Sequence, residues 1–168
     1  MARVVLITGG NLGDVKSRLQ QAQRLINDRI GAVMRCSHRY KSKAWGFDAE
    51  PMFTNQVLVA DTDLTPEEVL EEVQRMETEL GRDRAAEERE KAASGQHYCS
   101  RCIDIDILFY DDRVIDRPEL KIPHPLMQER DFVLAPLCEV MRDRVHPVLG
   151  KTIGCLRDEL AAREGRVR

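Results

Sequence analysis

The sequence is poor in aromatic residues, at 5%, and has neither a long apolar run nor a strong excess of one charge. The 26 Lys+Arg and 29 Asp+Glu residues leave a net charge of −3, which argues against a general nucleic-acid binder, since such proteins are markedly basic. No apolar run approaches the roughly 20 residues of a membrane-spanning helix, and residues 4–7 are too short for a signal peptide. Five cysteines, an odd number, argue against a secreted disulfide framework. We therefore expect a soluble cytoplasmic protein without nucleic-acid or membrane partners.

The 168 residues suit a single domain, residues 1–168, with a sizeable core. Hydrophobic periodicity and capping signals predict a strand at 4–7, a helix from Asp14 to residue 30, strands at 32–40 and 53–61, a helix at 65–80 and a strand at 102–110. This order predicts an α+β fold, a ferredoxin-like βαββαβ sandwich whose antiparallel sheet has helices on one face. A further helix around residues 131–141 belongs to a C-terminal helical extension.

The clearest chemical signal is the pair of acids in the last predicted strand. Its apolar residues fall at every second position from Ile103 to Phe109, so we expect them to share the core face. Asp104 and Asp106 then share the other face, roughly 6–7 Å apart. Divalent cations would relieve their repulsion, and oxygen-only ligands favour Mg²⁺. The alternative is an ordinary amphipathic strand with its acids in water.

Residues 82–100 show no periodicity and have no apolar face to bury, so we expect a long mobile loop. Arg82, Arg84 and Arg101 flank this segment. Arginine binds phosphate oxygens bidentately and keeps its charge, so these residues suit a phosphate clamp beside the aspartates. A solvated charged loop is the alternative, because the segment also holds four acids.

Two other stretches resemble known sites; the first is rejected, and for the second a zinc site is the less favoured interpretation. Gly9-Gly10 followed by Lys16-Ser17 resembles a P-loop, but Val15 stands where a glycine must precede the lysine, and Asp14 would repel phosphate. His97, Cys99 and Cys102 resemble part of a zinc site, but a fourth ligand at the usual spacing is missing.

Three further residues have two interpretations each. His124 lies between two prolines, and a stiff loop suits a positioned phosphate donor, although a lone histidine is often structural. Phe53 and Asn55 share a strand face and would suit a flat heterocycle with donors and acceptors, whereas an ordinary core phenylalanine is the alternative.

Taken together, these residues belong to a series of short motifs that runs in order from about residue 4 to about residue 140. The series is Gly-Asn-Leu-Gly at 10–13, Trp45-Gly46, Phe53-Thr54-Asn55, Glu77 with Gly81-Arg82, Arg101 with Asp104 and Asp106, Pro123-His124, and Arg130 with Phe132. It resembles the 6-hydroxymethyl-7,8-dihydropterin pyrophosphokinase family of folate biosynthesis. The resemblance implies a ferredoxin-like fold and transfer of the β,γ-pyrophosphate of ATP to the pterin hydroxymethyl group, with release of AMP.

The resemblance also implies roles for individual residues. Asp104 and Asp106 would bind two Mg²⁺ ions and, with Arg82 and Arg101, form the catalytic set. The implied ATP-binding residues are Gln74, Glu77, Arg84, Arg101, Ile107, His124 and Arg130. The implied pterin-binding residues are Ser42, Lys43, Ala44, Trp45, Phe53, Asn55, Asp104 and Phe132.

The sequence departs from the family pattern at two places. Many relatives have Thr-Pro-Pro where this chain has Ser42-Lys43-Ala44. A loop tryptophan that packs on the pterin in some members has no equivalent, and Tyr98 or His97 could take its place. A rival interpretation is a ferredoxin-like module that binds metal without catalysis, but the arginines near the aspartates favour the kinase. The sequence does not distinguish a monomer from a weak homo-oligomer.

Overall fold

Two long antiparallel strands form the centre of the main sheet in the computed structural model, which describes residues 1–42, 52–83, 85, 88–89, 92 and 102–165. β1 (Ala2–Gly10) pairs on one side with β4 (Phe53–Thr62) and on the other with β5 (Asp104–Tyr110). β2 (Val33–Cys36) and β3 (Tyr40–Ser42) both pair with the far side of β4. The resulting antiparallel order, β2-β4-β1-β5, is that of a ferredoxin-like sheet, so the predicted fold class is confirmed.

The helices α1 (Val15–Arg29) and α2 (Pro66–Glu79) begin where the capping signals indicate. The Asp14 carboxylate caps α1 by accepting the Ser17 N–H at 3.1 Å, so a side chain of the protein occupies the helix N-terminus where a P-loop would bind phosphate. Thr65 and Glu68 form the predicted capping box of α2, with both reciprocal hydrogen bonds present.

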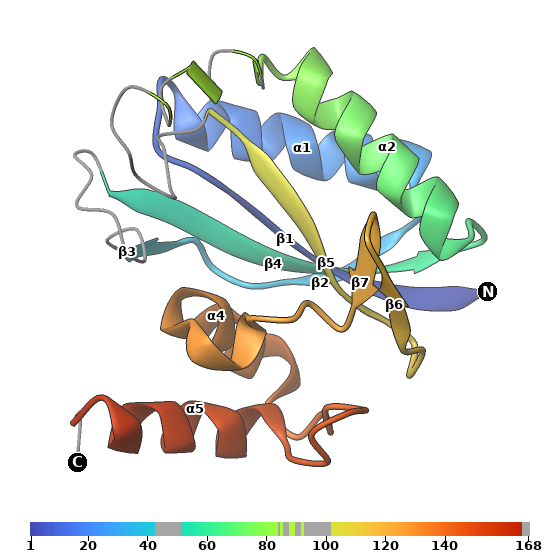
Figure 1. Ribbon diagram of the computed structural model, residues 1–168. Helices are drawn as coiled ribbons and strands as arrows, with labels where there is room; N and C mark the ends of the chain where they lie inside the picture. Colours follow the sequence, from blue (N-terminus) through green and yellow to red (C-terminus); the bar gives the residue numbers. More distant parts are fainter. Residues whose placement is uncertain (43–51, 84, 86–87, 90–91, 93–101, 166–168) are drawn as a thin grey trace.

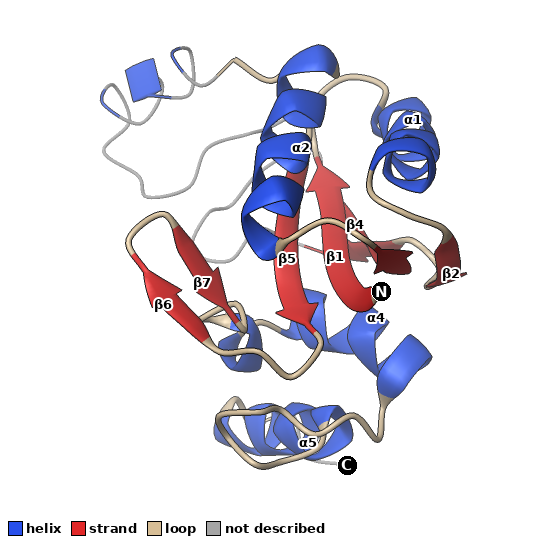
Figure 2. Cartoon of the chain, turned by 90° about the vertical axis from the view of Figure 1, so that its right-hand side faces the viewer, coloured by secondary structure: helices blue, strands red, loops and turns tan. Residues whose placement is uncertain are grey.

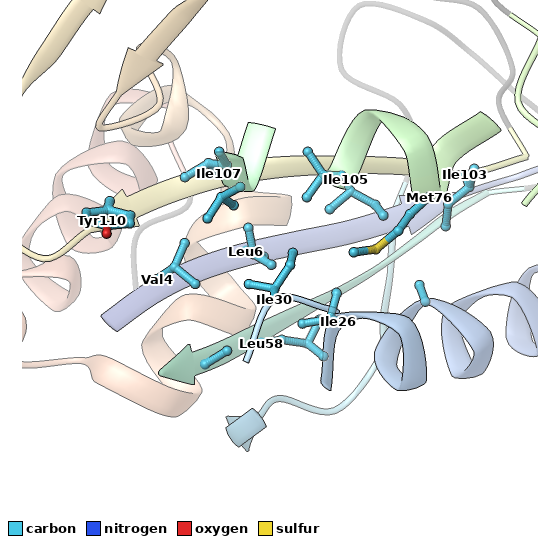
Figure 3. Close-up of a cluster of buried hydrophobic side chains, with 14 of the residues drawn as sticks. Val4, Leu6, Ile26, Ile30, Leu58, Met76, Ile103, Ile105, Ile107 and Tyr110 are labelled. Atoms are coloured by element: carbon cyan, nitrogen blue, oxygen red, sulfur yellow. The ribbon is translucent and has the colours of Figure 1, made fainter. Parts of the chain in front are cut away.

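Helices cover both faces of the sheet (Figure 1). Alternate residues of β1 divide between two cores. Val4 and Leu6 pack with α1 and α2 on one face (Figure 3), whereas Val5 and Ile7 pack with α4 (Asp131–Met141) and α5 (Ile153–Arg163) on the other. The expectation of helices on one face was therefore wrong, because the C-terminal extension folds back as a second layer.

A β-bulge changes the faces of β5. The pairing of β5 with β1 shifts register between Val5 and Leu6, which adds one residue to β5. Ile107 stays in the core under α1 and α2, but Phe109 joins the core under α4. The expected single apolar face from Ile103 to Phe109 is thus correct only as far as Ile107.

The strand predicted at 32–40 is also divided. Between β2 and β3 the Ser37 N–H donates to the Val57 carbonyl at 2.9 Å, while the Val57 N–H donates to the Ser37 hydroxyl at 3.0 Å. A side-chain oxygen thus replaces a main-chain acceptor, and the regular ladder stops. Met34 and Cys36 are exposed, so the alternation there does not mark a core face.

A small hairpin, β6 (Ile115–Arg117) and β7 (Leu120–Ile122), follows β5 and lies beside it (Figure 2). It was not predicted, and neither was the short 3₁₀ helix Met127–Glu129. Within the predicted loop at 82–100, the described residues 85, 88, 89 and 92 are helical, and the remainder past residue 83 lies outside the described residues. No helix among the described residues combines the length and apolar composition that crossing a membrane requires.

Candidate active site

The two aspartates of β5 lie on the sheet face that carries α4. Asp104 pairs with Gly9 and Asp106 with Ile7, while Ile105 points into the core under α2. Their side chains stay 28% and 40% exposed, so solvent and ligands reach both carboxylates. The predicted shared face of Asp104 and Asp106 is confirmed.

The donor set at these aspartates fits Mg²⁺. No group of three or more His, Cys, Asp or Glu side chains in the described part of the chain is arranged to hold a metal. A cation between Asp104 and Asp106 would therefore take its other ligands from water and substrate oxygens. Mg²⁺ is bound in this way at many phosphate-transfer sites, because it needs only one or two carboxylates and keeps several waters.

A buried ion-pair network that involves α2 holds the Asp104 carboxylate. The Arg82 Nη1 donates to Glu77 Oε2 at 2.8 Å and to Asp104 Oδ1 at 3.0 Å. The Ile105 N–H donates to the same Glu77 oxygen at 2.8 Å. The Arg82 and Glu77 side chains are only 6% and 3% exposed. Glu77 thus ties α2, Arg82 and the backbone of β5 together, next to the first aspartate.

His124 faces the second aspartate in a neutral state. Its Nδ1 accepts the Leu126 N–H at 3.3 Å, so the imidazole proton is on Nε2, which lies 3.9 Å from Asp106 Oδ2. Burial, reinforced by Arg130, lowers the pKa of His124 to about 4. The residue therefore presents an uncharged N–H donor beside Asp106.

A cavity of about 210 Å³ opens between α2, β5 and the β6–β7 hairpin. Its lining mixes apolar side chains with four ionisable ones; it consists of Leu70, Val73, Ile105, Asp106, Ile107, Glu119, Leu120, Lys121, His124 and Pro125. A cavity that offers both apolar contacts and polar groups suits the flat base of a nucleotide. The residues of α2 and of the hairpin were not predicted for this site, because they belong to no motif in the sequence.

A second polar feature lies across Gly9 from Asp104. Gly9 pairs with Asp104 on one side and with Asn55 on the other, so the three residues form one row on the same face. A Cβ on Gly9 would lie 2.2 Å from Asn55 Nδ2, so the glycine leaves room for the amide. Among the described residues, neither the buried Asn55 Oδ1 nor the Ser42 Oγ has a hydrogen-bond partner. Both oxygens are buried acceptors that no described residue uses.

Two half-buried phenylalanines lie on the same side. Phe53 is two residues before Asn55 on β4 and pairs with Ser42. Phe132, in the first turn of α4, packs against the core beneath that helix, and the Arg130 guanidinium lies 5.7 Å from its ring centre. The structure thus brings Ser42, Phe53, Asn55 and Phe132 to the side of the sheet on which Asp104 and Asp106 also lie.

Other predicted site residues are not placed at the aspartates. The Gln74 side chain is exposed on α2. Lys43, Ala44, Trp45, Arg84 and Arg101, together with His97 and Tyr98, lie outside the described residues.

Comparison with known proteins is consistent with this geometry. A sequence model of the 7,8-dihydro-6-hydroxymethylpterin-pyrophosphokinase family matches residues 5–142. The chain is 39% identical over 153 residues to 2-amino-4-hydroxy-6-hydroxymethyldihydropteridine pyrophosphokinase of Aquifex aeolicus, covering 91% of this chain and 89% of the relative. The enzyme of the same name from Porphyromonas gingivalis is 38% identical over 141 residues, covering 83% of this chain and 91% of the relative.

Among solved structures, the chain is similar to Plasmodium falciparum HPPK-DHPS wild type with pteroate, with a TM-score of 0.77. The match covers 98% of this chain and 45% of that chain at 16% identity. At this identity the likeness supports the fold alone.

Proposed function

This chain belongs to the 7,8-dihydro-6-hydroxymethylpterin-pyrophosphokinase family, and we propose that the sheet face around Asp104 and Asp106 is its active site. The enzyme transfers pyrophosphate to hydroxymethyldihydropterin in folate synthesis. ATP is the donor, so loss of its β,γ-pyrophosphate leaves AMP. The observation that carries the site assignment is the row Asp104–Gly9–Asn55, in which a carboxylate and a buried amide oxygen without a partner among the described residues flank one glycine.

Asp104 and Asp106 hold two Mg²⁺ ions in this proposal. Bound Mg²⁺ would neutralise negative charge on the phosphates of ATP and polarise them toward attack. The two carboxylates support this role because they share a face and remain partly exposed.

Arg82 and His124 bind and orient the phosphates from opposite sides of the aspartates. Arg82 is held by Glu77 and Asp104, so its positive charge stays fixed where the transferring group develops charge. The neutral His124 offers its Nε2 proton as a donor beside Asp106. The cavity next to His124, with Ile107 in its wall, receives the adenine base.

The pterin lies between Phe53 and Phe132, with its amide edge on Asn55. Flat heterocycles stack favourably between aromatic rings, and a pterin ring presents N–H donors that suit the free Asn55 Oδ1. Gly9 leaves this place open, and Asp104 lies near the hydroxymethyl group that is to react. The resemblance also implies that Glu77 lines the ATP site, and its hydrogen bond to Arg82 is the contact through which it would support the phosphates.

The remaining assignments rest on the family resemblance. They are catalysis by Arg101, ATP binding by Gln74, Arg84, Arg101 and Arg130, and pterin binding by Ser42, Lys43, Ala44 and Trp45. We also propose that residues 1–168 form one catalytic domain. We also propose that the reaction takes place in the cytoplasm.

Substitution of each aspartate tests the site assignment. We expect Asp104→Asn and Asp106→Asn to lower kcat at least about a hundredfold, because each removes a charged metal ligand. Titration calorimetry with Mg²⁺ and a non-hydrolysable ATP analogue should show weaker metal binding in both. Asp112→Asn, just after β5 and with a side chain 87% exposed, is the matched control. Wild-type turnover and metal affinity in both variants would exclude this face as the active site.

A further inference from the structure

Glu139, on α4, makes several hydrogen bonds to the segment that connects β2 with β3. Its carboxylate accepts the His38 N–H at 3.1 Å, the His38 ring Nδ1–H at 2.8 Å and the Tyr40 hydroxyl at 2.7 Å. Neither the ATP site nor the aspartates use this carboxylate. It joins the second helical layer to an edge strand of the sheet, 99 residues earlier in the chain.

The same carboxylate lies at a fixed distance from Phe132, which is one wall of the proposed pterin slot, the space between Phe53 and Phe132. Phe132 and Glu139 are seven residues apart on α4, which places them on one face of the helix, about 10 Å apart along its axis. The bonds of Glu139 to His38 and Tyr40 therefore add to the core packing that holds α4, and with it Phe132, on the sheet.

The opposite wall of the slot is the strand that β3 pairs with. Tyr40 pairs directly with Asn55, and Ser42 pairs with Phe53. Cross-strand neighbours in an antiparallel ladder lie about 4.5–5.5 Å apart, so a shift of Tyr40 is transmitted to Asn55. The Tyr40–Glu139 bond therefore connects the strands that carry Ser42, Phe53 and Asn55 with the helix that carries Phe132.

We infer that Glu139 is a positioning residue for the pterin substrate: by holding Tyr40 and His38 it sets the spacing between Phe132 on α4 and Asn55 and Phe53 on β4. This inference rests on the proposed function, because it needs the pterin to bind in that slot. The hydrogen bond from Tyr40 lowers the pKa of Glu139 and raises the pKa of Tyr40. Both shifts favour the ionised carboxylate bonded to the protonated phenol.

The test compares Glu139→Ala, Glu139→Gln and Tyr40→Phe with the wild-type enzyme. Glu159→Gln is the matched control, because it removes the charge of a carboxylate on α5 that bonds to Lys151 and Cys155, neither of which lies on β3 or α4. Steady-state kinetics give KM for each substrate. A separate binding assay follows the fluorescence of 6-hydroxymethylpterin with a non-hydrolysable ATP analogue and Mg²⁺. Thermal unfolding shows that each variant is folded.

We expect Glu139→Ala to raise the pterin KM and the pterin Kd by about 10- to 100-fold, because small misplacements of binding groups cost that much. The KM for ATP should change by no more than about twofold, since the nucleotide cavity lies between α2, β5 and the β6–β7 hairpin, away from the contact of Glu139 with β3. Glu139→Gln keeps one acceptor oxygen and should restore most of the affinity, and Tyr40→Phe should lie between the two.

Equal changes in both KM values, or an unchanged pterin Kd in folded variants, would overturn the inference. If Glu139→Ala does not fold, Glu139→Gln and Tyr40→Phe decide the question by the same readouts. Failure of the wild-type enzyme to form AMP would instead overturn the proposed function, and the binding assay would still show whether Glu139 sets pterin affinity.

Discussion

Glu77 is the residue whose removal most directly probes the network below the aspartates. Glu77→Ala deletes a carboxylate that accepts two hydrogen bonds of 2.8 Å, from Arg82 and from the Ile105 backbone. The Arg82 guanidinium, only 6% exposed, then keeps Asp104 at 3.0 Å but loses its second anion. The buried Ile105 N–H loses the acceptor that Glu77 supplies.

The structure allows the cost to be worked out. Removing one partner of a buried ion pair typically destabilises a protein by about 3–5 kcal/mol, and an unpaired buried N–H adds about 1–3 kcal/mol. These costs are not additive, and Asp104 retains part of the pairing, so we expect about 3–5 kcal/mol in total. For a domain of this size that corresponds to a fall in Tm of roughly 10 °C.

Urea unfolding at constant slope m measures this effect, with Glu79→Ala as the control. Glu79 is on the same helix, two residues later, with a side chain 49% exposed and an ion pair to Arg29 at 2.8 Å. Such a surface pair contributes about 0–1 kcal/mol. Glu77→Gln, which keeps an acceptor for Ile105, separates the hydrogen bond from the charge. A loss in Glu77→Ala no larger than in Glu79→Ala would refute the reasoning.

Three other predictions concern the pterin face and the scaffold. Gly9→Ala places a Cβ 2.2 Å from Asn55 Nδ2, so steady-state kinetics should show a higher pterin KM and an almost unchanged ATP KM; equal KM shifts would contradict this. Gly31→Ala places a Cβ 1.7 Å from the Asp61 carbonyl oxygen, and urea unfolding should show a loss of about 3 kcal/mol or more. His146 Nδ1 accepts the Val148 and Leu149 N–H groups, and burial lowers the pKa of His146. The neutral imidazole therefore contributes fully to stability above about pH 6.5, and this contribution is lost as the pH falls below that value. The urea midpoint should therefore fall more steeply between pH 7 and pH 5 in the wild type than in His146→Asn; parallel curves would argue against this role.

Much of the central fold can be predicted because its residues carry strong local signals. Thr65 and Glu68 specify a helix start, and the alternation of isoleucine with aspartate from Ile103 to Ile107 specifies both the buried face and the face of Asp104 and Asp106. These signals act over a few residues, so the sequence alone reveals them. The strand order then follows from the order of the elements.

The features that sequence analysis missed depend on contacts between distant residues. The bulge that turns Phe109 to the other core arises from the pairing of β5 with β1. The three-residue strands β6 and β7 are too short to show a hydrophobic period in the sequence. The Ser37 hydroxyl interrupts the 32–40 strand only because Val57 lies opposite.

The candidate site shows the same division. The aspartates are visible in the sequence, whereas the buried bonds of Glu77 and the contact of Glu139 with Tyr40 appear only in the folded chain. A carboxylate on a helix has the same local pattern whether it is solvated or buried. Only its packing shows what it binds.

Product analysis tests the central claim most directly. The purified enzyme is incubated with ATP, Mg²⁺ and 6-hydroxymethyl-7,8-dihydropterin, and the nucleotide and pterin products are separated by chromatography. The account predicts AMP and pterin pyrophosphate in equal amounts, with formation of both dependent on Mg²⁺ and on Asp104 and Asp106. Formation of ADP with a pterin monophosphate, or no pterin-dependent AMP, would contradict it.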